Sequence, residues 1–317
     1  MVYDKNTPFK YDPISLINKD LIDESITEEE LSKIESDIHE VLNSDHIGNK
    51  YMSLKEDDEM ASLAAMGIIS VAIIIRHIIK WIRGKYTLKY KKIVDQSKDA
   101  NDMYQKIMDL IKHDKMVRFK HRNDRIDCVQ KNIAMVDNET KKKYYATIDE
   151  LAYDSEWYRN KIESTMEYLK NNKDMTFEQI MEDLINDITN GFEENHGYIK
   201  TCTPIATIEY AQNVKLEAAL MYFKDMFEVQ YQNIYLINYV MSQQLICMQL
   251  LQTVYDNMIK RYGSDKNNKK YIDKLFKILL NNSQLSMDFN NKVLTCISAV
   301  YENAYKELSK IYDILKS

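Results

Sequence analysis

Residues 204–262 read PIATIEYAQNVKLEAALMYFKDMFEVQYQNIYLINYVMSQQLICMQLLQTVYDNMIKRY, with no glycine and no proline after the first position. Thr203 followed by Pro204 is typical of a helix start, because the missing amide of proline costs nothing in the first turn. We therefore expect one long helix over about 204–262, ending before Gly263. At 1.5 Å per residue, this helix would be about 88 Å long.

A heptad pattern runs along this stretch. With Asn213 at position a, twelve of the fifteen a and d positions are apolar. Flanking tyrosine and leucine side chains widen the apolar stripe, which predicts a helix at the centre of a multi-helix bundle. Gln230 and Gln244 fall on the stripe. We expect both amides to be buried and hydrogen-bonded to a neighbouring helix, which would define the register.

Glycine and proline are scarce in the whole chain, with 6 and 3 residues among 317. Hairpin turns and glycine-rich loops depend on these residues, so helices are the main remaining structure. Thr27 precedes Glu30, and Thr176 precedes Gln179, by the spacing of a capping box. We predict an all-α fold: an elongated multi-helix bundle with a long central helix and an apolar helix near the N-terminus. We also expect more than three quarters helix and no sheet of three or more strands.

The charge distribution divides the chain into three expected parts. Residues 1–60 carry 16 acidic and 6 basic side chains, whereas residues 76–125 carry 15 basic and 6 acidic ones. We therefore expect an acidic N-terminal arm with short helices over 1–52. An apolar helix continuing into a basic helical segment is expected over 53–123, and the long-helix bundle over 124–317.

An apolar segment is the first candidate for function. Residues 61–75 are uncharged and mostly apolar, and the apolar character continues to Trp81. These positions cover about 22 Å, short of the ~30 Å hydrocarbon core, so a spanning helix would have to continue to about Lys80 with Arg76 inside it. A buried helix of a soluble bundle has the same composition, and this alternative stays open. The predicted membrane-contact residues are Ile68, Ile69, Ile73, Ile74, Ile78 and Trp81.

Basic residues follow the apolar segment, as they do on the cytoplasmic flank of a membrane helix. A second, denser basic run lies at 112–122. We expect these side chains to contact anionic lipid or another polyanion, and a solvated basic face is the alternative. Nucleic acid is not an expected partner, because no recognised motif accompanies the run and the pI of about 5.7 is acidic. The predicted contact residues are Lys85, Lys89, Lys91, Lys92, Arg118, Lys120 and Arg122.

No catalytic motif is visible in the sequence, since glycine-rich phosphate loops, HExxH and CxxC are all absent. The four cysteines are 45 to 74 residues apart, which argues against a zinc site and a disulfide scaffold. Glu193 and His196 have the spacing of a di-iron ligand pair, but Gly191 and Gly197 bracket them, so we expect a loop without a metal. We predict a non-enzymatic protein with no cofactor.

These features favour a helical structural protein with a membrane-active apolar helix, such as a virion component of a phage or other virus, or a pore-forming protein. The excess of lysine over arginine, 36 to 7, indicates an AT-rich genome and favours a viral source. The alternative is a soluble helical-bundle scaffold or adaptor that binds protein partners, with the apolar helix as core. Expected partners are membrane lipid, other proteins and further copies of the chain. Residues 1–12 lack the pattern of a cleavable signal peptide, and virion or membrane association is the expected location.

Overall fold

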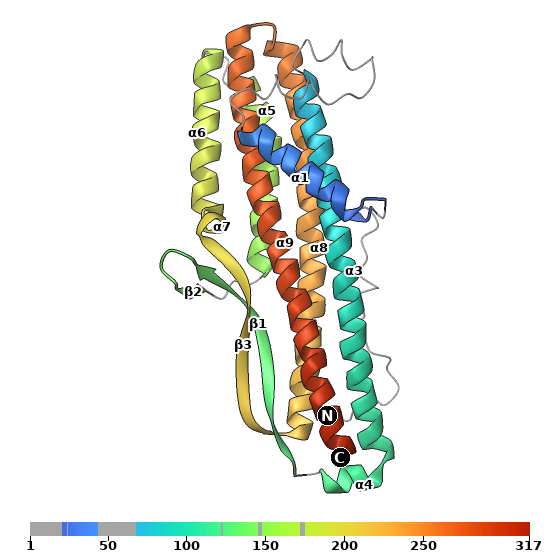
Figure 1. Ribbon diagram of the computed structural model, residues 1–317. Helices are drawn as coiled ribbons and strands as arrows, with labels where there is room; N and C mark the ends of the chain where they lie inside the picture. Colours follow the sequence, from blue (N-terminus) through green and yellow to red (C-terminus); the bar gives the residue numbers. More distant parts are fainter. Residues whose placement is uncertain (1–20, 24, 44–67, 122, 145–147, 172–174) are drawn as a thin grey trace.

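Three long helices lie side by side along the axis of an elongated bundle (Figure 1). They are α3 (Ile68–His113), α8 (Leu216–Tyr262) and α9 (Lys266–Lys316). The structure is a computed structural model that is 82% helical, which confirms the predicted all-α multi-helix fold. It describes residues 21–23, 25–43, 68–121, 123–144, 148–171 and 175–317.

Shorter helices pack on the outside of these three. α5 (Ile148–Asn171) lies against α8, and α6 (Phe177–His196) lies against α9 and α5. α1 (Glu28–Asn43) crosses α3 (Figure 1). Two short helices, α4 (Lys115–Lys120) and α7 (Tyr198–Thr201), connect the longer elements to the sheet described below.

Side-chain caps explain where several helices begin. The Thr27 hydroxyl accepts a hydrogen bond from the Glu30 amide at 3.2 Å, and the Glu30 carboxylate accepts one from the Thr27 amide at 2.9 Å. Thr176 and Gln179 form the same reciprocal pair at the start of α6. At α9, the Asp265 carboxylate accepts from two amides of the first turn. Each such cap stabilises its helix by about 1 kcal/mol. Both predicted capping boxes are confirmed.

The buried face of α8 follows the predicted heptad pattern from Leu216 onward. Every a and d position from Leu216 to Met258 is buried. Gln230 and Gln244 are 2% and 7% exposed, as the pattern requires. The Gln230 Oε1 accepts a hydrogen bond from Asn233 Nδ2 within α8, at 3.3 Å. Among the described residues neither glutamine bonds to another helix, so that part of the prediction was wrong.

The prediction that the long helix begins at Pro204 was wrong, because Cys202–Lys215 form strand β3. This strand pairs antiparallel with β1 (Arg125–Asp137), and β2 (Lys143–Tyr144) pairs with the end of β1, in the order β2-β1-β3. The expectation of no three-stranded sheet was therefore also wrong. β-Branched residues occupy four of the first seven positions of β3 and favour a strand. Pro204 is tolerated because β3 is an edge strand.

Asn213 marks the point where β3 turns towards α8. It has a positive φ of 57°, and the strand register shifts opposite it, between Ile126 and Cys128. Its amide donates a hydrogen bond to Asp127 Oδ1 at 3.0 Å. Asparagine adopts left-handed backbone more readily than most residues, so this bulge redirects the chain into the helix. Asn213 is therefore not a position of the helical heptad pattern.

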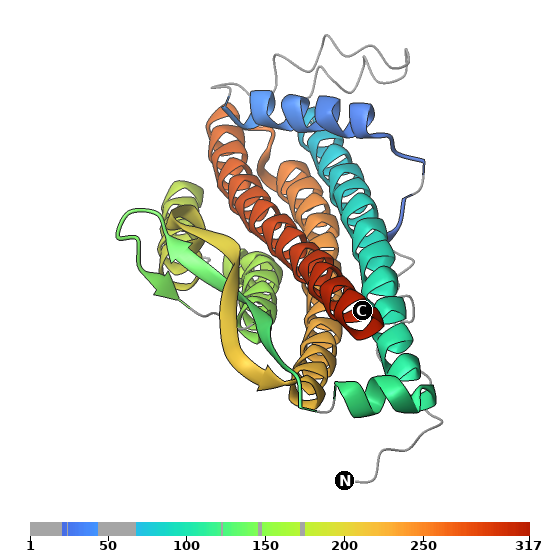
Figure 2. The ribbon, with the colours of Figure 1, turned by 60° about the horizontal axis from the view of Figure 1, so that its bottom comes forward.

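The sheet lies along one side of the long helices and shares their core. β1 contacts α8 and α9, and β3 packs on α9 (Figure 2). One hydrophobic cluster joins α1, α3, α5, α6, α8 and α9 with residues of both long strands. The segments predicted from charge, 1–52, 53–123 and 124–317, all contribute to it. Of the first segment, the structure describes only 21–23 and 25–43.

Gly84 allows α1 to approach α3 closely. A Cβ atom at this position would lie 2.5 Å from Leu31 Cδ2 and 3.1 Å from Ile26 Cγ2. We predict that Gly84→Leu displaces α1, because the clash outweighs the roughly 1 kcal/mol gain in helix propensity. Hydrogen–deuterium exchange of Glu28–Asn43 should accelerate, with α8 and α9 unchanged. Lys98→Leu, at an exposed position about four turns later on α3, is the control and should leave α1 protected. Equal exchange in both variants would contradict the prediction.

Candidate functional site

The first candidate site is the apolar segment, which continues into α3. Ile74 and Ile78 are 0% exposed and Trp81 is 2% exposed, all within the hydrophobic core. The described part of the segment therefore packs inside the bundle, which favours the core alternative. Contact of this segment with a membrane stays a prediction. The remaining predicted contact side chains lie outside the described residues: Ile68, Ile69 and Ile73, together with residues 61–67.

The basic residues that follow on α3 have different surroundings from one another. Lys85 forms an ion pair with Glu35 of α1 at 2.7 Å, and its Nζ lies 6.0 Å from the centroid of the Trp81 ring. It therefore ties α1 to α3. Lys89 is half-buried, and burial, together with the charges of Lys92 and Lys85, lowers its pKa. Neither lysine is a freely solvated base.

The remaining predicted polyanion contacts fall into two separate groups. Lys91 and Lys92 are exposed near the middle of α3, whereas Arg118 and Lys120 are exposed on α4, beyond its end. The intervening helix is about 30 Å or more in length at 1.5 Å per residue. Arg122 lies outside the described residues. One continuous basic surface is therefore not formed by these side chains.

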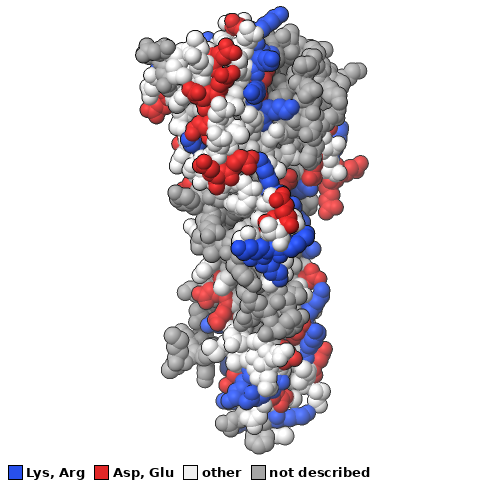
Figure 3. Space-filling view, turned by 90° about the vertical axis from the view of Figure 1, so that its left-hand side faces the viewer, with Lys and Arg blue, Asp and Glu red and all other residues white. Residues whose placement is uncertain are grey.

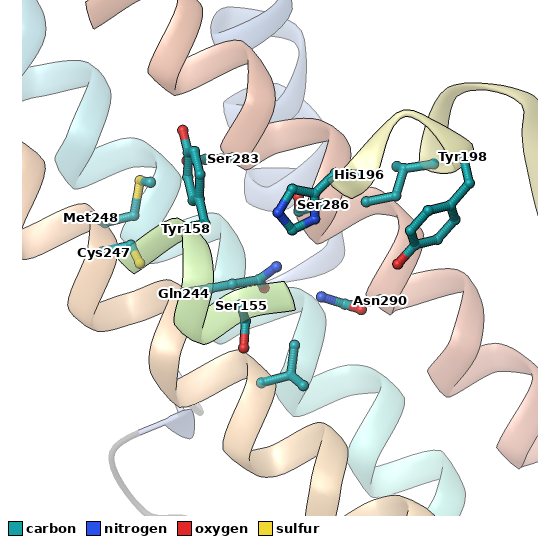
Figure 4. A pocket seen from close by; sticks show the side chains of 12 residues that line it. Ser155, Tyr158, His196, Tyr198, Gln244, Cys247, Met248, Ser283, Ser286 and Asn290 are labelled. Carbon is teal, nitrogen blue, oxygen red and sulfur yellow. The ribbon is translucent and has the colours of Figure 1, made fainter. Parts of the chain in front are cut away.

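A small cavity lies where α5, α6, α7, α8 and α9 meet (Figure 4). Its volume is about 30 Å³, enough for one or two water molecules and too small for a larger ligand. Its walls combine apolar and aromatic side chains with hydroxyls and amides. The polar lining residues include Ser155, Gln244, Ser283, Ser286 and Asn290.

Two buried amide oxygens at this cavity have no hydrogen-bond donor among the described residues. They are Gln244 Oε1 and Asn290 Oδ1, on side chains that are 7% and 3% exposed. A buried acceptor without a donor costs about 1 to 3 kcal/mol, and a water in the cavity would remove that cost. Asn290 was not predicted from the sequence. Its place at the cavity depends on how α9 packs against the other helices, and no local sequence pattern indicates that packing.

His196 also lines the cavity, but not in the loop that the sequence predicted. Helix α6 continues through Gly191 to His196, so the expectation of a loop was wrong. Glycine is required at position 191 of this helix, because the Trp157 indole packs against it. A Cβ atom there would lie only 2.9 Å from the indole ring. Glu193 is exposed and pairs with Lys200, whereas His196 is buried. The two side chains do not converge on a metal.

Aromatic rings surround His196 on its buried side. Its ring centroid lies 5.0 Å from that of Phe192, 5.3 Å from that of Trp157 and 6.2 Å from that of Tyr158. Tyr158 in turn donates a hydrogen bond to the Leu279 carbonyl oxygen of α9 at 2.7 Å. Tyr158, like Asn290, was missed from the sequence, because its role depends on where α5 meets α9.

Burial keeps the titratable groups of this site uncharged at neutral pH. It lowers the pKa of His196 to about 4 and raises the pKa of the Cys247 thiol to about 12. It also raises the pKa of the Tyr158 hydroxyl. The thiol is therefore a weak nucleophile and the imidazole a weak base, because each charged form would be poorly solvated. The cavity can hold water, but these groups are not tuned for acid–base or nucleophilic chemistry.

The cysteines and acidic residues do not assemble a metal site in the described part of the chain. Cys202, Cys247 and Cys296 are buried free thiols, and the side chain of Cys128 lies outside the described residues. Over the described ranges, no group of three or more His, Cys, Asp or Glu side chains could hold an ion.

Comparison with known proteins identified no relative of this chain. No protein-family model, curated protein or solved structure matches the chain. Fold and site together define it as an elongated helical bundle with a small antiparallel sheet and a small cavity between its helices.

His196 predicts a loss of stability in mild acid. Its pKa is about 4 in the folded protein, against 6.5 for an unperturbed histidine, so the unfolded chain binds a proton that the folded chain does not. The free energy of unfolding should therefore be constant above about pH 7 and should fall as the pH drops below 6.5. Between about pH 7 and about pH 5 the loss should be about 2 kcal/mol, measured by urea unfolding.

His196→Gln is the matched variant, because it removes the titrating group. The difference between the two proteins isolates His196 from other groups, such as Asp256 and Asp273, whose pKa values burial raises. Those carboxyls act in the opposite direction, since their protonated forms are favoured in the folded state. Equal pH dependence in His196→Gln and the unmodified protein would show that His196 is not buried in its neutral form.

Proposed function

We propose that the protein is a non-enzymatic helical-bundle scaffold or adaptor, which binds protein partners and contains its apolar helix as core. The observation that carries this proposal is the burial of Ile74, Ile78 and Ile82, each 0% exposed inside the common hydrophobic cluster. A helix that acts on lipid in the resting protein would expose those side chains instead.

The outer surface supports the same proposal. Figure 3 shows a band of acidic side chains beside a group of basic ones on the face that carries α6, and such a charged surface suits water or a polar protein partner. Among the described helices, α8 is long and apolar enough to cross a membrane by length and composition, and 61% of its most apolar window is buried. That burial is typical of a core helix in a bundle.

The absence of catalysis stays part of the proposal, and the cavity chemistry supports it. His196, Cys247 and Tyr158 are all held in uncharged forms by burial, and the space beside them admits only water. A catalytic acid or base usually has a pKa near the working pH, whereas burial moves the pKa values of these three groups away from neutral pH.

A triggered membrane-inserting protein, in a virion or as a pore former, is the second candidate. It is favoured by the composition of α3, in which isoleucines at 74, 75, 78, 79 and 82 leave few polar positions. In that function α3 would have to leave the core before it met lipid. Leakage of dye from lipid vesicles separates the candidates: a scaffold releases no dye, whereas an inserter releases it after its trigger.

Substitution within α3 tests the core assignment. We predict that Ile78→Asp unfolds the protein or lowers its stability by several kcal/mol, because a carboxylate would be buried without a partner. Arg76→Asp, at an exposed position on the same helix, should change stability by about 0.5 kcal/mol or less. Thermal unfolding by circular dichroism measures both. A stable Ile78→Asp protein would contradict the core assignment.

Partner binding is tested by crosslinking in an extract of the natural source. The folded protein and Arg76→Asp should crosslink to the same partner through residues on the outer faces of the helices. Ile78→Asp should lose these crosslinks because its surfaces are disrupted. Crosslinks that are as strong with Ile78→Asp, or dye release by the unmodified protein, would count against the scaffold function.

A further inference from the structure

One end of the elongated bundle gathers exposed apolar side chains. α4, the end of α3, the start of α8 and the end of α9 all lie there (Figures 1 and 2). Met116 of α4 is 77% exposed and Met221 of α8 is 51% exposed. Tyr222 and Ile314 follow at 37% and 45%. Half of the eight large exposed hydrophobic residues in the described part of the chain therefore belong to one end, which we call the α4 end.

Exposed basic side chains precede and follow Met116 in the sequence at this end. Lys112, Lys115, Arg118 and Lys120 are all exposed, and they lie within nine residues of sequence. Within the described residues, none of these four bases forms an ion pair. A surface that combines exposed apolar groups with unneutralised bases differs from an ordinary solvated face, in which charges of both signs alternate.

Two acidic residues that flank α4 in sequence are engaged in local structure. Asp114 caps α4, since its carboxylate accepts hydrogen bonds from the Met116 and Val117 amides at 2.9 and 3.1 Å. Asp124 Oδ2 lies 2.6 Å from Nδ1 of the buried His121. Asp114 and Asp124 therefore serve the local fold. All charged side chains of α4 itself are basic. The exposed carboxylates of the neighbouring helix ends belong to α3, α8 and α9: Asp109, Glu217 and Asp313.

We propose that the α4 end binds the surface of an anionic phospholipid bilayer. The bases would contact the headgroups, while Met116 would enter the boundary between headgroups and acyl chains. The exposure of Met116 favours an anionic bilayer over a nucleic acid. A nucleic acid would contact the bases and leave Met116 in water. This contact needs no movement of α3 out of the core, so it does not depend on the scaffold function or on membrane insertion.

Co-sedimentation with vesicles tests the proposal. The full-length protein should bind phosphatidylcholine vesicles that contain phosphatidylserine, should not bind phosphatidylcholine alone, and should be released by high salt. Arg118→Gln with Lys120→Gln should weaken binding about thirtyfold, since each base near an anionic surface accounts for about fivefold. Met116→Ser should also weaken binding, at unchanged charge.

Lys91→Gln with Lys92→Gln is the matched control, because it removes two exposed bases from the middle of α3. This variant should bind the vesicles as the unmodified protein does, and circular dichroism should show the same fold for all variants. Equal loss in the control, no vesicle binding by the unmodified protein, or full binding by Met116→Ser would overturn the proposal. Binding to duplex DNA without binding to vesicles would also overturn it. Dye release is a separate readout, and its absence leaves surface binding intact.

Discussion

Phe227 of α8 packs against Tyr104 of α3 and Tyr301 of α9, with ring centroids 6.1 and 5.8 Å apart. This contact joins all three long helices at one level, and all three side chains are buried. Aromatic pairs of this geometry stabilise by about 0.5 to 1.5 kcal/mol beyond the burial of their area. The remaining elements pack on this three-helix core: α5 on α8, the sheet on α8 and α9, and α1 on α3. Loss of the central packing would therefore remove the support of every outer element.

The same core contains buried polar side chains, and some of them are hydrogen-bonded within the protein whereas others are not. Tyr86 of α3 donates to Asn238 of α8, which links two helices and favours one register. Gln244 and Asn290 instead face a small cavity with unsatisfied oxygens, where water can supply the missing bonds. This core is sensitive to acid, because burial disfavours the charged form of the His196 imidazole.

The apolar segment and the basic segment, which are adjacent in sequence, have separate places in the structure. From Ile74 onward the first is part of the core, where α1, α8 and α9 surround it. The second includes Lys85, which is paired with Glu35, the exposed bases in the middle of α3, and the exposed bases of the α4 end. The surface that we propose for lipid binding is thus displaced along α3 from the segment whose composition resembles a membrane helix. Surface binding and a buried apolar helix are compatible in one protein.

Local interactions explain what the sequence by itself determined: the helical class, the capping boxes at Thr27 and Thr176, and the buried face of α8 from Leu216 onward. These depend on residues within one or two turns, so periodicity and spacing reveal them. Tertiary structure alone decided that Cys202–Lys215 form a strand, because their hydrogen bonds go to Arg125–Asp137, far away in the chain. It also decided the burial of Ile74 and the assembly of the cavity around His196. Composition cannot distinguish a helix covered by protein from one covered by lipid, since both coverings are equally apolar.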